Sequence, residues 1–144
     1  GFKFIIITNQ AGIARGMIEL AELDRIHKNM IDEFKKGDIE ILDVYVCEHH
    51  WDHGCFCGKP SPGMLLQASK EHLFRLDQTV FIGDDPRDCQ ASVNAGCHSI
   101  FIGNVDELKN LEKKEQPIYT SSSLIGAIDV IIDFFSTLSN FKIS

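Results

Sequence analysis

CEHHWDHGCFCGKPSPG, residues 47–63, is the stretch around which the rest of the chain is organised. Three cysteines and a histidine fall here in the pattern Cys-x-His, five residues, Cys-x-Cys, and the candidate ligands are Cys47, His49, Cys55 and Cys57. Three thiolates and an imidazole form one of the closed tetrahedral sets that bind structural Zn²⁺. On an extended segment, residues two positions apart point to the same side, so each pair can face one metal. The spacing therefore predicts a zinc loop, in which Gly54 permits a tight return.

Two alternatives remain for these residues. The cysteines could be buried thiols or disulfide partners, and His50 or His53 could replace His49 as the fourth ligand. Only Cys89 and Cys97 lie elsewhere in the chain. Because the sequence contains no recognisable secretory signal peptide, we expect metal-bound thiolates in a reducing cytoplasm rather than a disulfide scaffold.

The bulk composition is that of an ordinary folded domain. The chain has 144 residues, of which 44% are hydrophobic and 24% charged, and this is enough for one core. We expect one domain over residues 1–136, a C-terminal tail over residues 137–144, and a monomer. The net charge of −7 argues against binding to nucleic acid or to an anionic membrane, since both need basic surface. No apolar run approaches the roughly 20 residues of a membrane span.

Strand and helix patterns alternate along the chain. Apolar, β-branched runs such as KFIII are typical of strands buried on both faces of a parallel sheet. Apolar positions that recur every three or four residues predict amphipathic helices. The expected strands are 3–7, 41–46, 79–82, 98–102 and, at an edge, 117–120, and the expected helices are 19–36, 62–74, 87–95, 105–111 and 124–135. We therefore predict an α/β fold with a mostly parallel sheet and helices on both faces.

Prolines, glycines and small polar residues mark the expected helix ends. Ser61 is expected to cap the helix that starts at Pro62, and Pro86 can start the next one. Gly37 and Gly96 are expected to end the helices that precede them.

Polar residues follow two of the expected strands. Thr8 and Asn9 come directly after the first strand, and the strand at 79–82 runs into Gly83-Asp84-Asp85-Pro86-Arg87-Asp88. The carboxyl edge of an open α/β sheet is where ligands bind. Three acids within five residues repel one another, which predicts a bound cation. A plain turn at the first position and a surface capping cluster at the second are the alternatives.

Three stretches together resemble the haloacid dehalogenase superfamily. They are the strand followed by TNQAGIARG (8–16), the zinc loop leading into GKPSPGML (58–65), and the strand followed by GDDPRD (83–88) with a helix ending in AGC. More narrowly, they resemble its zinc-containing branch, the D-glycero-D-manno-heptose 1,7-bisphosphate and histidinol-phosphate phosphatases. The resemblance covers residues 2–135. It implies a Rossmann-like fold, Mg²⁺ and Zn²⁺ as cofactors, and hydrolysis of a small phosphorylated metabolite, as in carbohydrate metabolism.

The resemblance also implies roles for individual residues. Thr8 would hydrogen-bond a phosphate oxygen, Lys59 would stabilise the phosphoryl group, and Asp84 would bind Mg²⁺. Asp85 would lie in the outer shell of that metal. Zinc would be structural, because four protein ligands leave no open position. The other implied substrate contacts are Asn9, Gln10, Ala11 and Gly58.

The chain departs from the family pattern at the nucleophile. The family uses two aspartates, in a DxD motif after a central strand, as nucleophile and general acid/base, whereas no acidic residue precedes Thr8 here. We therefore expect that the native protein begins earlier. We also expect that the central strand, between the strands that end at Thr8 and Asp84, is missing from this chain, and that the chain as given is inactive.

Two further departures concern the substrate. The family usually has arginine before the lysine and often lysine after the aspartate, where this chain has Gly58 and Asp85. Both changes remove a cation near the phosphate, which disfavours a highly anionic bisphosphate. The alternatives to a phosphatase are a zinc-stabilised domain that binds a phosphorylated ligand or a partner without catalysis, and the polynucleotide 3′-phosphatase branch. The acidic charge and the zinc loop argue against the latter.

Overall fold

The computed structural model describes residues 2–140, except for the side chains of residues 51, 139 and 140. The chain falls into two compact units that divide between Gly58 and Lys59. Each unit contains its own parallel sheet, of two strands in the first and three in the second. The predicted α/β fold with parallel strands is thus confirmed.

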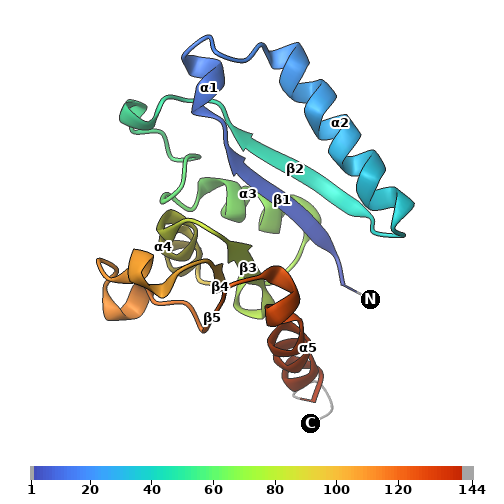
Figure 1. Cartoon of the computed structure of the whole chain (residues 1–144), viewed down its shortest axis with the longest axis vertical. Helices are drawn as coiled ribbons and strands as arrows, with labels where there is room; N and C mark the ends of the chain where they lie inside the picture. Colours follow the sequence, from blue (N-terminus) through green and yellow to red (C-terminus); the bar gives the residue numbers. More distant parts are fainter. Residues whose placement is uncertain (1, 141–144) are drawn as a thin grey trace. The chain divides into compact units, whose positions relative to one another are not determined.

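The first unit is built on a pair of parallel strands. Its elements are β1 (Phe4–Asn9), α1 (Ala11–Ala14), α2 (Leu20–Lys36), β2 (Ile41–Cys47) and the 3-10 turn η1 (Trp51–His53). Strand β1 pairs with β2 in parallel, and α2 runs alongside β2 (Figure 1). Figure 1 also shows that α1 and the start of the loop after β2 leave the pair at the same end. The carboxyl ends of both strands therefore lie together.

Strand β1 is longer than the sequence predicted. It includes Thr8 and Asn9, because β2 continues to Cys47 and offers backbone partners to both, with Asn9 opposite Cys47. Helix α2 ends at Gly37 as predicted. Of its apolar stripe, Leu23 is buried while other members such as Phe34 stay exposed, because two strands offer little surface to cover.

The second unit is built on three parallel strands in the order β3-β4-β5. Its elements are α3 (Gly63–His72), η2 (Leu76–Gln78), β3 (Val80–Gly83), α4 (Pro86–Ala95), β4 (His98–Ile102), η3 (Val105–Leu108), η4 (Lys113–Glu115), β5 (Tyr119–Ser121) and α5 (Leu124–Asn140). The short strand β5 occupies the edge of this sheet, as predicted. Residues 137–140 of the predicted tail continue α5, and the rest of that tail lies outside the described residues.

The core of the second unit lies around its middle strand. Ile100 and Phe101 of β4 are fully buried, because strands flank β4 on both sides and α4 packs against it. The Phe101 side chain clusters with Cys89 of α4 and Leu108 of η3. This packing fixes β3 and α4, which lie on either side of the acidic turn.

Local signals set the helix ends in the second unit. Helix α4 begins with Pro86 after an Asp85 cap and ends at Gly96, both as predicted. The prediction for α3 was wrong by one residue. Pro62 is the cap, the helix starts at Gly63, and no side chain, Ser61 included, bonds to the first turn.

Strand β1, which contains Thr8, and strand β3, which leads to Asp84, each lie at an edge of their own sheet. Within residues 2–140, β1 pairs only with β2, and β3 pairs only with β4. The expected central strand would pair with such edges, and its absence from this chain stays a prediction. None of the described helices combines the length and the apolar character that crossing a membrane requires.

Candidate active site and metal centre

The loop that follows β1 is hydrogen-bonded to the end of β2. The backbone N–H of Gln10 donates to the carbonyl oxygen of Cys47 at 2.7 Å. The Gln10 side-chain amide donates to the Thr8 hydroxyl oxygen at 3.1 Å. Since the hydroxyl oxygen accepts this bond, its own O–H can donate to another acceptor, such as a phosphate oxygen.

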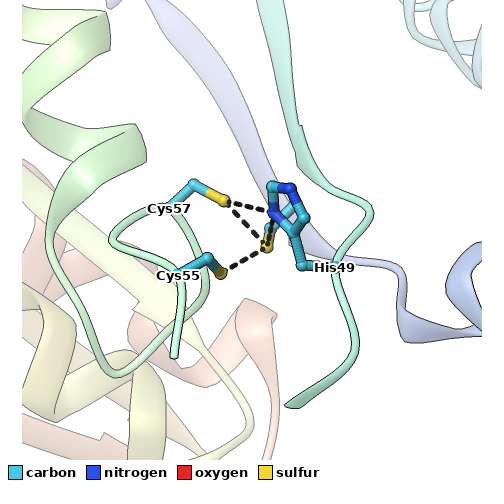
Figure 2. A group of neighbouring side chains, drawn as sticks. His49, Cys55 and Cys57 are labelled. Carbon is cyan, nitrogen blue, oxygen red and sulfur yellow. Dashed lines mark hydrogen bonds between the residues drawn. The ribbon is translucent and has the colours of Figure 1, made fainter. Parts of the chain in front are cut away.

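The four predicted metal ligands come together in the first unit. One ligand atom from each of Cys47, His49, Cys55 and Cys57 lies within 4.8 Å of every other. Figure 2 shows His49 and Cys57 pointing at each other across the centre of the group, with Cys55 below. The Cys47 sulfur lies 3.4 Å from that of Cys55 and 3.0 Å from that of Cys57, and His49 Nδ1 lies 3.1 Å from the Cys57 sulfur.

These separations fit a tetrahedral zinc site. Metal–ligand bonds of about 2.0–2.3 Å place the ligand atoms of a tetrahedron roughly 3.3–3.8 Å apart. Four of the edges, each involving Cys47 or His49, measure 3.0, 3.1, 3.4 and 3.7 Å, so two lie within this range and two are shorter. The donor set also fits, since thiolates and a neutral imidazole are the ligands that Zn²⁺ prefers. The group is therefore arranged to hold a metal once the closest side chains, Cys47 and Cys57, move slightly apart.

Two glycines shape this loop. Gly54 adopts a φ of 64° where the loop turns back, a conformation that side chains rarely accept. The Gly58 N–H donates to the Cys55 sulfur at 3.3 Å, and a Cβ on Gly58 would lie 3.2 Å from the sulfurs of both Cys47 and Cys55. A side chain at position 58 would require these sulfurs to shift by a few tenths of an ångström.

The thiols of the group influence one another's pKa. Burial raises the pKa of Cys47 to about 12, and burial is also the largest influence behind the raised pKa of Cys57. At Cys55 burial again acts upward, but hydrogen bonds from Cys57 and Cys47 outweigh it and lower the pKa to about 7. One thiolate therefore forms easily and the others are opposed, a cost that a divalent cation removes.

The two spare histidines have other partners. Arg15 Nε donates to His50 Nε2 at 3.2 Å, and His50 Nδ1 contacts the Asp52 carboxylate. His53 stacks on the ring of His49, with ring centroids 5.4 Å apart. Of the three candidates, His49 is therefore the one that the structure brings to the sulfurs.

Lys59 and Asp88 form a sheltered ion pair in the second unit. Lys59 Nζ donates to Asp88 Oδ1 at 2.5 Å, and the two side chains are 15% and 4% exposed. The same Nζ lies 5.6 Å from the centroid of the Phe81 ring. Gly83 makes room for this arrangement, because a Cβ there would lie 2.1 Å from Asp88 Oδ2.

The three acids of the turn after β3 have different surroundings. Asp88 is buried against Lys59 and accepts the N–H of Asp85 at 3.1 Å. Asp85 caps α4, and both its oxygens bind the Arg87 guanidinium at 2.9 and 2.7 Å. Hydrogen bonds from Arg87 accordingly hold the pKa of Asp85 below its usual range. Asp84 is exposed, and within residues 2–140 its carboxylate has no hydrogen-bond or ion-pair partner.

A comparison with protein-family models identifies the family of the chain. Residues 56–127, half of the chain, match the model of the HAD-hydrolase-like family. The chain belongs to this family. The resemblance inferred from the sequence is thus confirmed.

Curated relatives of this HAD-like chain include phosphatases. It is 40% identical, over 79% of its length, to the D-glycero-alpha-D-manno-heptose-1,7-bisphosphate 7-phosphatase of Campylobacter jejuni, of which it covers 62%. It is 30% identical, over 85% of its length, to the histidine biosynthesis bifunctional protein HisB of the same species, of which it covers 35%. The chain spans about three fifths of the length of the first heptose-bisphosphate phosphatases that it matches.

A solved structure supports the same kinship. The HAD-like chain superposes on D,D-heptose 1.7-bisphosphate phosphatase from B. bronchiseptica with a TM-score of 0.81 and 27% identity. The match covers 91% of this chain and 74% of that one, which was crystallised with magnesium and phosphate.

Sequence reasoning missed two interactions in this HAD-like chain. Asp88 was counted among the three acids that predict a bound cation, yet it is the counter-ion of Lys59, 29 residues away. The bond between Arg15 and His50 joins residues 35 apart and was not predicted either. The sequence places Asp88 in the first turn of α4 but gives no signal for its partner, and none pointed to the second pair.

Proposed function

We propose that this chain carries the phosphate-binding and metal-binding part of a Mg²⁺-dependent phosphomonoester hydrolase. Its substrate would be a small phosphorylated metabolite of the heptose bisphosphate or histidinol phosphate type. The observation that carries the proposal is that the three acids of the turn after β3 differ in their partners. Asp88 holds Lys59 and Asp85 holds Arg87, whereas Asp84 is left open for a cation.

Each site residue has a proposed role in this reaction. The Thr8 hydroxyl would donate to a phosphate oxygen, and the Lys59 ammonium would offset the charge of the phosphoryl group, which is the main task in phosphoryl transfer. Asp84 would bind Mg²⁺, which supplies further positive charge at the transferring group. Asp85 remains a candidate for the outer shell of that ion. The loop residues proposed to contact substrate are Asn9, Gln10, Ala11 and Gly58.

The metal of the cysteine cluster is proposed to be a structural Zn²⁺. Cys47, His49, Cys55 and Cys57 fill a tetrahedral set, so no position is left to activate water. Its role would be to fix the loop that ends at Gly58, directly before Lys59.

The nucleophile is proposed to lie outside these 144 residues. Family members form an aspartyl-phosphate on a DxD aspartate, and no acidic residue precedes Thr8 in this sequence. The 144-residue chain alone is therefore expected to release no phosphate from a phosphomonoester. A separately added segment with an apolar strand and a DxD motif is expected to restore turnover.

Binding of Mg²⁺ provides the direct test. Titration calorimetry with Mg²⁺ alone is expected to detect binding to the wild-type chain that Asp84→Asn abolishes. Asp85→Asn is the matched control, one residue away, and is expected to weaken binding much less. Equal losses in the two variants would contradict the assignment of Asp84. Binding without restored turnover would favour the catalytically inactive, zinc-stabilised binding domain.

The setting of the protein is also proposed. Free thiols and a zinc centre suit a reducing cytoplasm. A role in carbohydrate metabolism is proposed from the names of the relatives. A monomeric state is proposed from the sequence alone.

A further inference from the structure

Arg15 differs from the other three arginines of the chain. Each of the others donates both Nε and Nη to the two oxygens of one carboxylate, and the pairs are Arg25 with Glu22, Arg75 with Asp77, and Arg87 with Asp85. Arg15 is exposed, and its guanidinium meets a neutral acceptor, the His50 ring. Within residues 2–140, it is the arginine with no carboxylate partner.

The contact with His50 fixes Arg15 without neutralising it. Because Arg15 Nε–H donates to Nε2 of the ring, Nε2 acts as the acceptor, and Nδ1 contacts the Asp52 carboxylate and the Asp52 N–H. Neither Nη group of Arg15 has a partner within residues 2–140. The guanidinium is thus held at one end and keeps its outer edge, with four N–H donors, open for an anion. Tethering lowers the entropy lost when such a side chain binds.

Arg15 also belongs to the loop that carries the residues proposed to hold the reacting phosphate. It follows α1, a single turn about 6 Å long, which starts directly after Thr8 and Gln10. The same loop is bonded to the zinc loop twice, through Gln10 to Cys47 and through Arg15 to His50. Position 58, in the same unit, is glycine and offers no side-chain charge. Within the described residues, Arg15 is therefore a cation of this loop whose charge no carboxylate balances.

We propose that Arg15 binds a second anionic group of the substrate, a phosphate or a carboxylate, separate from the phosphate that reacts. Arg15 is then a specificity-determining residue, and His50 and Asp52 are positioning residues that hold it. The inference rests on the proposed function, since it presumes that a phosphate occupies the neighbouring loop. It names the substrate class as small phosphomonoesters that carry a second negative group.

Three sugar phosphates serve as probes that distinguish binding of the reacting phosphate from binding of the second anionic group. Glucose 6-phosphate carries one anionic group, glucose 1,6-bisphosphate adds a phosphate, and 6-phosphogluconate adds a carboxylate. Calorimetry in the presence of Zn²⁺ and Mg²⁺ gives the affinity of each. At least one doubly anionic probe is expected to bind about tenfold or more tightly than glucose 6-phosphate, as a charge-assisted pair provides. Comparison of the two tells a phosphate from a carboxylate.

Variants then locate the effect. Arg15→Gln is expected to remove the advantage of the doubly anionic probe and leave glucose 6-phosphate binding unchanged. Arg75→Gln, which removes an exposed arginine paired to Asp77 in the other unit, is the control and is expected to change neither affinity. In nitrogen–proton spectra, the Arg15 Nε–H signal, assigned by its loss in Arg15→Gln, is expected to shift with the doubly anionic probe alone.

The outcomes distinguish this inference from the proposed function. If glucose 6-phosphate binds but Arg15→Gln affects all probes equally or none, the role of Arg15 is overturned and the phosphatase proposal stands. If no probe binds with Mg²⁺ present, both are overturned. Loss of zinc content in Arg15→Gln would show that the residue supports the loop rather than the ligand, which also overturns the proposal.

Discussion

The ion pair between Lys59 and Asp88 concentrates opposite charges where little water reaches. Removing one partner of such a pair leaves the other charge buried and uncompensated, which costs far more than the pair itself contributes. The small exposed fractions of both side chains, 15% and 4%, place this pair in that regime. Asp88 also accepts the Asp85 N–H, so its loss affects the turn as well.

Asp88→Asn is therefore expected to lower the free energy of unfolding by about 3 kcal/mol, the low end for a broken buried pair. Asp77→Asn breaks the exposed pair with Arg75 and is expected to cost less than about 1 kcal/mol. Urea denaturation of both variants measures the difference. Similar small losses in the two would mean that Lys59 is better hydrated than its exposed fraction indicates.

Residue spacing predicted the metal-ligand cluster, whose members are close in sequence, but not the pairings between residues that are far apart in sequence. The four ligands lie within eleven positions, so their pattern could be recognised in the sequence. The different surroundings of Asp84, Asp85 and Asp88 could not be recognised in the sequence. They depend on Lys59, which precedes α3 in the chain and pairs with Asp88. Nothing in the sequence around Arg15 indicates that His50 will meet it, since that contact depends on the register of β1 and β2.

At the scale of elements, α4 shows how a cap also sets the chemistry of a turn. Asp85 accepts the Arg87 N–H, and Asp88 accepts the Asp85 N–H, so the capping box holds the backbone on both sides of Pro86. Such a cap contributes roughly 1 kcal/mol. The proline and glycine signals predicted both ends of α4 correctly because they act within the helix itself. They failed at the start of α3, where Ser61 makes no capping bond.

Asp85→Asn separates the charge of this cap from its geometry, because asparagine caps helices equally well. The pKa of Asp85 is lowered by hydrogen bonds from Arg87. A carboxyl group with a lowered pKa in the folded state stabilises the protein above its unfolded value of 3.8, and this contribution is lost as pH falls through the folded value.

Wild type is thus expected to be slightly more stable than Asp85→Asn at pH 7, by less than about 1 kcal/mol for a half-exposed pair. The gap is expected to close as pH falls below 3.8. Urea midpoints across this pH range give the comparison, with Asp77→Ala as a second charge removal. A gap that widened on acidification would show that the sign of this linkage is wrong.

For the whole molecule, the division at Gly58 and Lys59 separates two kinds of stability. All four metal ligands belong to the first unit, while the buried cluster of Cys89, Phe101 and Leu108 belongs to the second. A two-strand sheet with a largely exposed helix buries little apolar surface, so a metal bound by these ligands would contribute much of the stability of the first unit.

Zinc removal is expected to act on one unit only. Chelation should greatly accelerate amide hydrogen exchange at β1 and β2, including the Gln10 N–H bonded to Cys47, and change exchange at β4 little. Exchange measured by mass spectrometry with and without chelator tests this, and Cys55→Ser should reproduce the effect without a chelator. Equal acceleration in β2 and β4 would show that the chain unfolds as a single cooperative whole.

The compact arrangement of the zinc ligands has a consequence for the order of folding. Cys47 and Cys57 close a loop of eleven residues, whereas residues 10–40 must be spanned before β1 can meet β2. Closing the shorter loop costs less chain entropy, and contacts of short sequence separation form sooner. The metal loop can therefore assemble first and present the end of β2 as a ready template, on which β1 aligns with Asn9 opposite Cys47.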